Sequence, residues 1–157
     1  MFRRLVFLLL VITALLLLPG CESTAQKGAQ RTAMNNAIAA EPKGAYFVGR
    51  RYFKTEYRFW GYIRQSGEPW SSAKLVLINE SRKHVPDRER AAIGKDNNFE
   101  YKLFGNFTGE TIYEPASNAF YPEFMLTGYE LLTETPGPIF RETGATDPKR
   151  RIIPKPY

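Results

Sequence analysis

Histidine and cysteine, which serve in many proteins as bases, nucleophiles and metal ligands, are scarce in this sequence. Its 157 residues include one histidine, His84, and one cysteine, Cys21. A catalytic histidine needs a partner that orients its ring, and His84 stands between Lys83 and Val85 in a charged stretch with no such partner nearby. We therefore expect a solvated loop histidine, and we predict no catalytic residue, no metal site and no cofactor.

Paired carboxylates are the remaining catalytic possibility, since two of them about 5 to 10 Å apart can hydrolyse a glycosidic bond. The second half of the chain holds Glu110, Glu114, Glu123 and Glu130. No local motif marks these glutamates as catalytic, so structural or surface roles are the favoured interpretation. We expect a protein that is not an enzyme, and a hydrolase acting on cell-wall or other glycans is the alternative hypothesis.

Aromatic residues are the best candidates for a binding surface. The run from Tyr113 to Tyr129 interleaves rings with Pro115, Ser117 and Asn118. Amphipathic aromatics with small polar neighbours suit the recognition of carbohydrate or protein. The competing interpretation, which we favour for most of these rings, is that they fill the core of a small domain. The candidate binding residues are Trp60, Trp70, Tyr113, Phe120, Tyr121 and Tyr129.

The lone cysteine follows an apolar segment at the N-terminus. Arg3 and Arg4 precede residues 5–18, an apolar run that a single threonine interrupts. A membrane-spanning helix needs about twenty such residues, so this run has the length of a signal-peptide core. Small Gly20 then stands directly before Cys21. The order of charges, apolar core and small residue predicts a secreted protein.

The sequence Leu18-Pro19-Gly20-Cys21 resembles the lipobox of bacterial lipoproteins. The resemblance implies cleavage after Gly20 and acylation of Cys21 on its sulfur and on its new amino group. Two acyl chains anchor a protein almost permanently, because each buried methylene contributes about 0.8 kcal/mol. The resemblance thus implies an envelope protein anchored to a bacterial membrane, and Glu22 in place of aspartate favours the outer membrane. The alternative is an ordinary signal peptide with a chance cysteine.

Composition divides the chain into stretches of different character. We expect residues 1–20 to be the signal peptide, 21–44 the lipidated N-terminus and a flexible tether, 45–140 a folded domain and 141–157 a basic, proline-containing tail. The tether lacks aromatic residues, so it buries too little apolar surface to offset the entropy of ordering. Alanines at helical spacing nevertheless permit a short helix around residues 28–40.

The charge of the chain bears on its partners. Its formal net charge of +6 becomes +4 when Arg3 and Arg4 leave with the signal peptide. A surface of this charge favours anionic partners, but it is too mild to indicate nucleic acid. We therefore predict contact with an envelope protein or an anionic envelope polymer, in addition to the contact with the lipid bilayer that the lipobox resemblance implies through acylated Cys21. The basic tail is either a contact for such a polymer or a solvated end.

Residues 45–140 alternate short apolar or aromatic runs with turn residues. This pattern predicts an all-β fold, which we expect to be a small antiparallel β-sandwich of about six to seven strands. In the clearest strand, 99–103, Phe99, Tyr101 and Leu103 share one face. Residues 74–78 are apolar on both faces and should lie centrally. Further strands are expected at 46–53, 57–64, 111–114 and 124–132.

One part of this domain has a familiar pattern. The residues concerned are Gly61, Tyr62, Ile63, Arg64, Gly67, Pro69, Ala73, Leu75 and Leu77. They resemble the opening of carboxypeptidase regulatory-like domains, which are small transthyretin-like β-sandwiches. That family continues with a turn for which this chain offers Asp96, Asn98 and Phe99, and Asn98 tolerates positive φ. The resemblance covers residues 60–104 and implies a sandwich, without implying an activity.

The stretch of residues 81–92 is highly charged and breaks the alternation of the strands. We expect an exposed loop with one helical turn after Pro86, which Asp87 would cap. Asp87 and Glu89 alternate with Arg88 and Arg90. Such alternation is typical of a solvated run of charges, so we expect no ligand site there.

Overall fold

The computed structural model describes residues 24–157, and the predicted signal peptide and lipidation site at Cys21 lie outside them. Contacts divide the chain into residues 1–32 and 33–157, and the description below concerns the second unit. In the described part of the chain, no helix has the length and apolar character needed to cross a membrane. The elements are α2 (Thr24–Ala39), β1 (Phe47–Arg51), β2 (Gly61–Gln65), η1 (Trp70–Ser72), β3 (Lys74–Asn79), α3 (Pro86–Glu89), β4 (Glu100–Glu114) and β5 (Ala119–Thr133).

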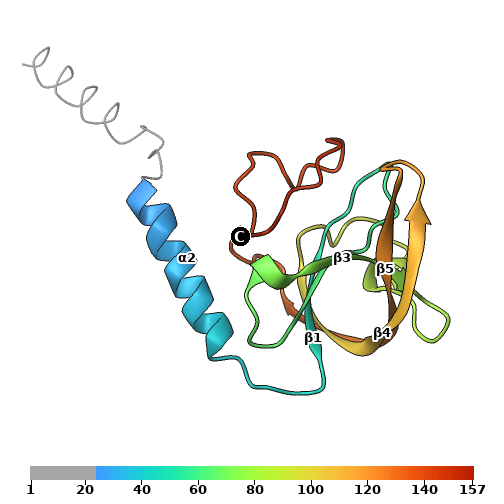
Figure 1. The fold of residues 1–157 in the computed structure, drawn as a ribbon, viewed down its shortest axis with the longest axis horizontal. Helices are drawn as coiled ribbons and strands as arrows, with labels where there is room; N and C mark the ends of the chain where they lie inside the picture. The colour runs from blue at the N-terminus through green and yellow to red at the C-terminus, as the bar shows by residue number, and fades with distance from the viewer. Residues whose placement is uncertain (1–23) are drawn as a thin grey trace, which may run out of the picture. The chain divides into compact units, whose positions relative to one another are not determined.

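The five strands close into a barrel in the order β1-β2-β3-β5-β4 (Figure 1). Gly49 of β1 lies opposite Ile63 of β2 on one side and Tyr101 of β4 on the other, both in antiparallel pairing. β3 and β5 run parallel, with Leu77 opposite Glu123. A five-stranded Greek-key barrel of this kind is the architecture of OB-folds. The all-β prediction is confirmed, and the sandwich of six to seven strands is wrong.

Strand β4 explains why a sandwich does not form. The strands predicted at 99–103 and 111–114 belong to one continuous strand, which bends instead of ending. Gly105 (φ 149°) and Gly109 (φ 90°) lie at or beside register shifts and adopt backbone angles that side chains rarely allow. A Cβ on Gly105 would stand 2.0 Å from the carbonyl oxygen of Met125. The bent strand pairs with both β1 and β5, and this closes the barrel.

The barrel carries an inner and an outer apolar layer. All five strands contribute to the inner layer, which therefore fills the barrel, and Trp60 and Val85 join it. The outer layer lies on β1, β2 and β3 and includes Val48, Tyr62 and Leu75. Because β3 places alternate residues in the two layers, both of its faces are buried, as predicted for residues 74–78.

The outer layer is covered by segments from both ends of the unit. Met34 and Ile38, at the end of α2, pack on it in the stretch expected to be a flexible tether. Ile139 and Phe140 pack on it from the C-terminal side. The segment 141–157, set apart by composition as a tail, continues over the same face, and its last part includes two buried prolines. In OB-folds this face binds the ligand, whereas here the chain itself occupies it.

Side chains of the barrel hold the C-terminal segment through its carbonyl groups. The hydroxyls of Tyr52 and Tyr62 donate to the carbonyl oxygens of Ile152 and Pro154, each at 2.5 Å. The buried ammonium of Lys54 donates to two further carbonyls of this segment. Figure 1 shows the segment, in red, beside the barrel. Main-chain recognition of this kind suits an extended, proline-containing segment.

Candidate functional site

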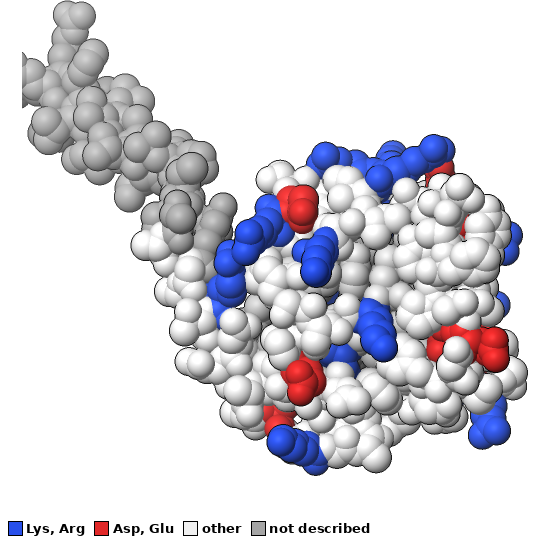
Figure 2. Space-filling view, viewed as in Figure 1, with Lys and Arg blue, Asp and Glu red and all other residues white. Residues whose placement is uncertain are grey.

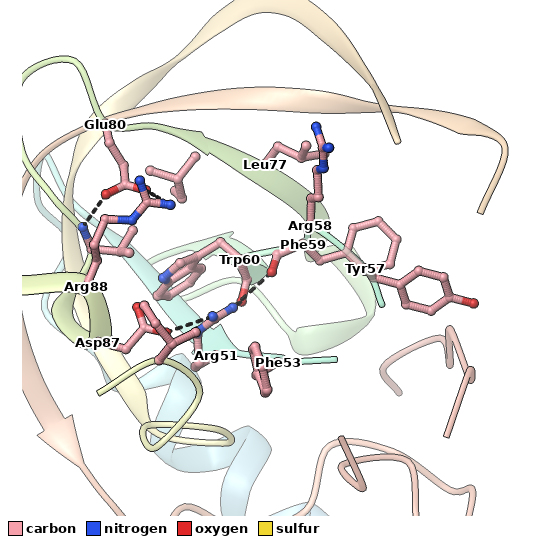
Figure 3. Close-up of a pocket in the computed structure, with 13 residues that line it drawn as sticks. Arg51, Phe53, Tyr57, Arg58, Phe59, Trp60, Leu77, Glu80, Asp87 and Arg88 are labelled. Atoms are coloured by element: carbon pink, nitrogen blue, oxygen red, sulfur yellow. Dashed lines mark hydrogen bonds and ion pairs between the residues drawn. The ribbon is translucent and has the colours of Figure 1, made fainter. Parts of the chain in front are cut away.

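A pocket of about 500 Å³ opens at the end of the barrel where β1 stops and β2 begins (Figure 3). The β1–β2 loop, the end of β3 and the segment around α3 form its walls. Small-molecule sites occupy about 300 to 1,000 Å³, so the volume suits a compact ligand. The apolar lining residues are Phe53, Tyr57, Phe59, Trp60, Leu77, Ile78, Val85 and Ile93, and the charged ones are Arg51, Arg58, Glu80, Asp87 and Arg88.

Trp60 lies at the floor of the pocket. Its main chain extends the sheet, because its N–H donates to the carbonyl oxygen of Val76 at 3.0 Å. Its side chain is 3% exposed and packs in the inner layer near Tyr101. The indole Nε1 has no hydrogen-bond partner among the described residues. A buried donor without an acceptor costs about 1 to 3 kcal/mol.

Asp87 is the second buried polar residue with an unused atom. The predicted helix cap is wrong, because Val85 holds the N-cap position of α3. The side chain of Asp87 is 2% exposed, and its Oδ2 accepts from Arg51 at 3.0 Å and from the N–H of Gly94 at 2.9 Å. Oδ1 has no partner among the described residues. Burial alone would raise the pKa of Asp87, but the charge of Arg51 and the hydrogen bonds outweigh it and lower the pKa. Asp87 is therefore an anion at neutral pH, with one oxygen able to accept.

The guanidinium of Arg51 fixes this part of the site. It is buried and also pairs with Asp96 at 3.3 Å, and it donates to the carbonyl oxygens of Phe59 and Trp60. Burial raises the pKa of Asp96 although Arg51 opposes the shift. Arg51 thus joins the β1–β2 loop to the segment around α3, and its charge is fully used inside the protein.

Two further arginines stand at the mouth of the pocket. Arg88 is 61% exposed, and its Nη2 lies 3.3 Å from the carboxylate of Glu80. Arg58 is exposed, and Figure 3 draws its guanidinium beside Leu77, away from Glu80. Within residues 24–157, Arg58 takes part in no ion pair. Arg58 is therefore the arginine of the mouth whose guanidinium is not already paired in this part of the chain, and a nearby anion would be attracted to it.

A second cavity of about 500 Å³ lies near the start of β1, between residues 43–47 and residues 65–68. Among the described residues, none of the buried polar atoms that lack hydrogen-bond partners belongs to the lining of this cavity. The pocket at the end of the barrel is therefore the stronger candidate site.

Of the six aromatic candidates, Trp60 alone lines the pocket, and Trp70 lies elsewhere in the core. The guanidinium carbons of Arg50 and Arg64 stand 5.2 and 4.8 Å from the centre of the Trp70 ring. Cation–π contacts of buried arginines contribute to stability. The structure therefore gives Trp70 a packing role in the outer layer.

The other four candidates lie on the β4–β5 hairpin. Tyr113 and Phe120 face each other near its tip with ring centroids 5.3 Å apart, and Phe120 is 67% exposed. Tyr121 packs against Phe59, with centroids 4.6 Å apart. Tyr129 packs against the inner layer, and its hydroxyl donates to a glutamate of α3. The structure thus pairs Tyr113 with Phe120 and disperses the rest.

The second-half glutamates have separate surroundings. Glu114 is buried, and it accepts hydrogen bonds from the N–H and the hydroxyl of Ser117, at 2.7 and 2.6 Å. Burial alone would raise its pKa, but these hydrogen bonds outweigh it and lower the pKa, which does not suit a general acid. Glu110 is exposed, Glu123 hydrogen-bonds to β3, and Glu130 forms an ion pair with β4.

Histidine and metal-ligand geometry give no further site. The expectation that His84 has no partner nearby is wrong, because its Nδ1 lies 3.1 Å from a carboxylate oxygen of Glu80; the ring is nevertheless 63% exposed, as expected for a loop histidine. In the part of the chain that the structure describes, no three side chains of histidine, cysteine, aspartate or glutamate gather into a cluster able to hold a metal ion.

Comparison of the chain with family models, with curated proteins and with solved structures finds no match. The functional argument therefore depends on the residues of the pocket. Sequence reasoning missed four charged residues of the pocket, because charged side chains are usually solvated: Arg51, Arg58, Asp87 and Arg88. The signal available was Arg51 at the end of an apolar strand, where a charge needs a buried partner.

Proposed function

We propose that this protein is a lipid-anchored, non-enzymatic binding module of the bacterial cell envelope. The anchor is Cys21, and the ligand site is the pocket at the end of the barrel. The apolar run of residues 5–18 and the sequence Leu18-Pro19-Gly20-Cys21 support the anchor, and the outer membrane is the favoured location. The basic face in Figure 2, where Lys and Arg side chains gather along the upper edge, supports an anionic envelope partner.

One observation carries the binding half of the proposal. Within residues 24–157, Trp60 Nε1 and Asp87 Oδ1 are buried without hydrogen-bond partners, and both residues line the same pocket. Each such atom costs about 1 to 3 kcal/mol, and natural folds keep few of them. A ligand that supplies an acceptor to Trp60 and a donor to Asp87 removes both costs upon binding.

The anchor is tested by replacing the acylated atom. We expect the wild type in the membrane fraction of the cells that make it, and Cys21→Ser in the soluble fraction of the envelope. The substitution removes the sulfur that would carry lipid and leaves the barrel unchanged. Membrane attachment of the Cys21→Ser variant would contradict the proposed anchor.

The binding half is tested by crosslinking in cells. Trp60→Phe removes the indole N–H and keeps an aromatic ring, so it should reduce the envelope material that the wild type recovers. Trp70→Phe is the matched control, because Trp70 is equally buried but lies outside the pocket. Identical recovery by the wild type and the Trp60→Phe variant would refute the pocket as the ligand site.

A further inference from the structure

We infer that the pocket takes an acidic saccharide, with a sugar hydroxyl at its floor and a carboxylate or phosphate against Arg58. This inference rests on the proposed function and names the class of ligand for the same site. The floor, the walls and the mouth of the pocket each restrict the ligand in a different way.

The floor selects a group that donates and accepts at once. Trp60 Nε1 can only donate, and Asp87 Oδ1, as part of a carboxylate, can only accept. A carboxylate ligand would satisfy Trp60 and repel Asp87, while an ammonium group would do the reverse. A hydroxyl both donates and accepts, so it suits both kinds of atom.

The walls select a ligand with apolar as well as polar surface. Phe59 packs with Tyr57, with ring centroids 5.0 Å apart, and Leu77 and Val85 add aliphatic surface. A sugar ring presents C–H groups on its faces and hydroxyls at its edge. Its faces can pack on the aromatic side chains while its edge reaches the floor. A fully charged or fully apolar ligand would leave one part of this lining unmatched.

The mouth selects a single anionic group. Arg88 already forms an ion pair with Glu80, whereas Arg58 makes no ion pair within residues 24–157. The planar guanidinium of Arg58 can pair with two oxygens of a carboxylate or a phosphate. Glu80, on a different side of the pocket in Figure 3, repels a second anion. The preferred unit therefore has one acidic group and several hydroxyls.

The test measures binding to the detergent-solubilised full chain by calorimetry. The probes are tetragalacturonate (carboxylate) and glucose 6-phosphate (phosphate), with neutral galactotetraose and tetraglutamate as controls. We expect at least one acidic sugar to bind about tenfold more tightly than the neutral sugar, as one charge-assisted pair would give. Equal binding of neutral and acidic sugars, binding of tetraglutamate alone, or binding of no acidic sugar would overturn the inference.

Variants assign the effect to the pocket. Arg58→Gln should lower the affinity for the acidic sugar about tenfold, which is the loss of one charge-assisted pair. Arg141→Gln removes an exposed arginine outside the pocket and should change nothing. An Arg58→Gln variant with wild-type affinity would overturn the inference. If Trp60→Phe still loses crosslinked material in cells while no acidic sugar binds, the ligand class fails and the proposed function stands.

Discussion

The ion pair between Glu41 and Arg64 supports a stringent prediction about stability. Glu41 follows α2, and its carboxylate accepts from Arg64 at 2.5 and 2.7 Å and from the N–H of Gly67 at 2.9 Å. The side chain of Arg64 is 1% exposed and that of Glu41 is 23% exposed. Glu41→Gln keeps the shape of the side chain and removes its charge. The buried guanidinium then loses its counter-ion.

The size of the stability loss in Glu41→Gln depends on the contacts that Arg64 retains. Removing one partner of a buried ion pair costs about 3 to 5 kcal/mol. Arg64 retains its contact with the Trp70 ring and a hydrogen bond to the carbonyl of Gln65, and the glutamine oxygen still accepts one hydrogen bond. We therefore expect Glu41→Gln to lower the free energy of unfolding by about 2 kcal/mol, and Tm by about 6 to 10 °C for a domain of this size.

Thermal and urea denaturation at pH 7 measure this loss, with Glu68→Gln as the control. Glu68 is exposed in the neighbouring turn, so its substitution should change stability by less than about 0.5 kcal/mol. Burial alone would raise the pKa of Glu41, but its bonds to Arg64 and Gly67 outweigh it and lower the pKa below 4.5. The stability that the wild type gains over Glu41→Gln should thus be complete at pH values above the ordinary pKa of glutamate. It should vanish as the pH falls through the lowered pKa of Glu41. Equal melting of Glu41→Gln and wild type at pH 7 would refute this reasoning.

Three further substitutions test the fold by urea denaturation. Tyr62→Phe should cost about 1 to 2 kcal/mol, because the carbonyl of Pro154 loses its buried donor; an unchanged midpoint would show that the C-terminal segment is not held there. Gly105→Ala should cost about 3 kcal/mol or prevent folding, because its Cβ collides with the backbone of Met125; wild-type stability would contradict the bend in β4. Phe120→Ser should change stability by less than about 0.5 kcal/mol, because the ring is exposed; a larger loss would mean that this ring is packed.

Local patterns were sufficient to predict β3 and the first part of β4. Within the predicted strand 74–78, every residue from Leu75 onward is apolar, so both faces of the strand are apolar. In the structure, both faces of β3 are buried. Tyr101 and Leu103 alternate with charged neighbours, and they point into the barrel. Asn98 has φ 68°, in line with the tolerance of asparagine for positive φ in the predicted turn. These features depend on residues that are near one another in sequence.

Features that depend on contacts between residues far apart in the sequence could not be predicted. Closure requires β5 to run parallel to β3 and the first part of the bent β4 to pair with β1, and both pairings join residues far apart in the sequence. The burial of Arg51 and Asp87 depends on their meeting across the end of the barrel. The basic, proline-containing composition of residues 141–157 predicted a tail. Side chains of the barrel bind the carbonyl groups of this segment, and composition carries no information about such contacts.

Attachment through Cys21 is the central claim, and mass spectrometry of the mature N-terminus tests it most directly. The protein is purified from membranes in detergent, digested, and its first peptide is identified. The account predicts a peptide that begins at Cys21 and carries lipid on both the sulfur and the amino group. A peptide that begins at Met1, or a Cys21 with a free thiol, would contradict it.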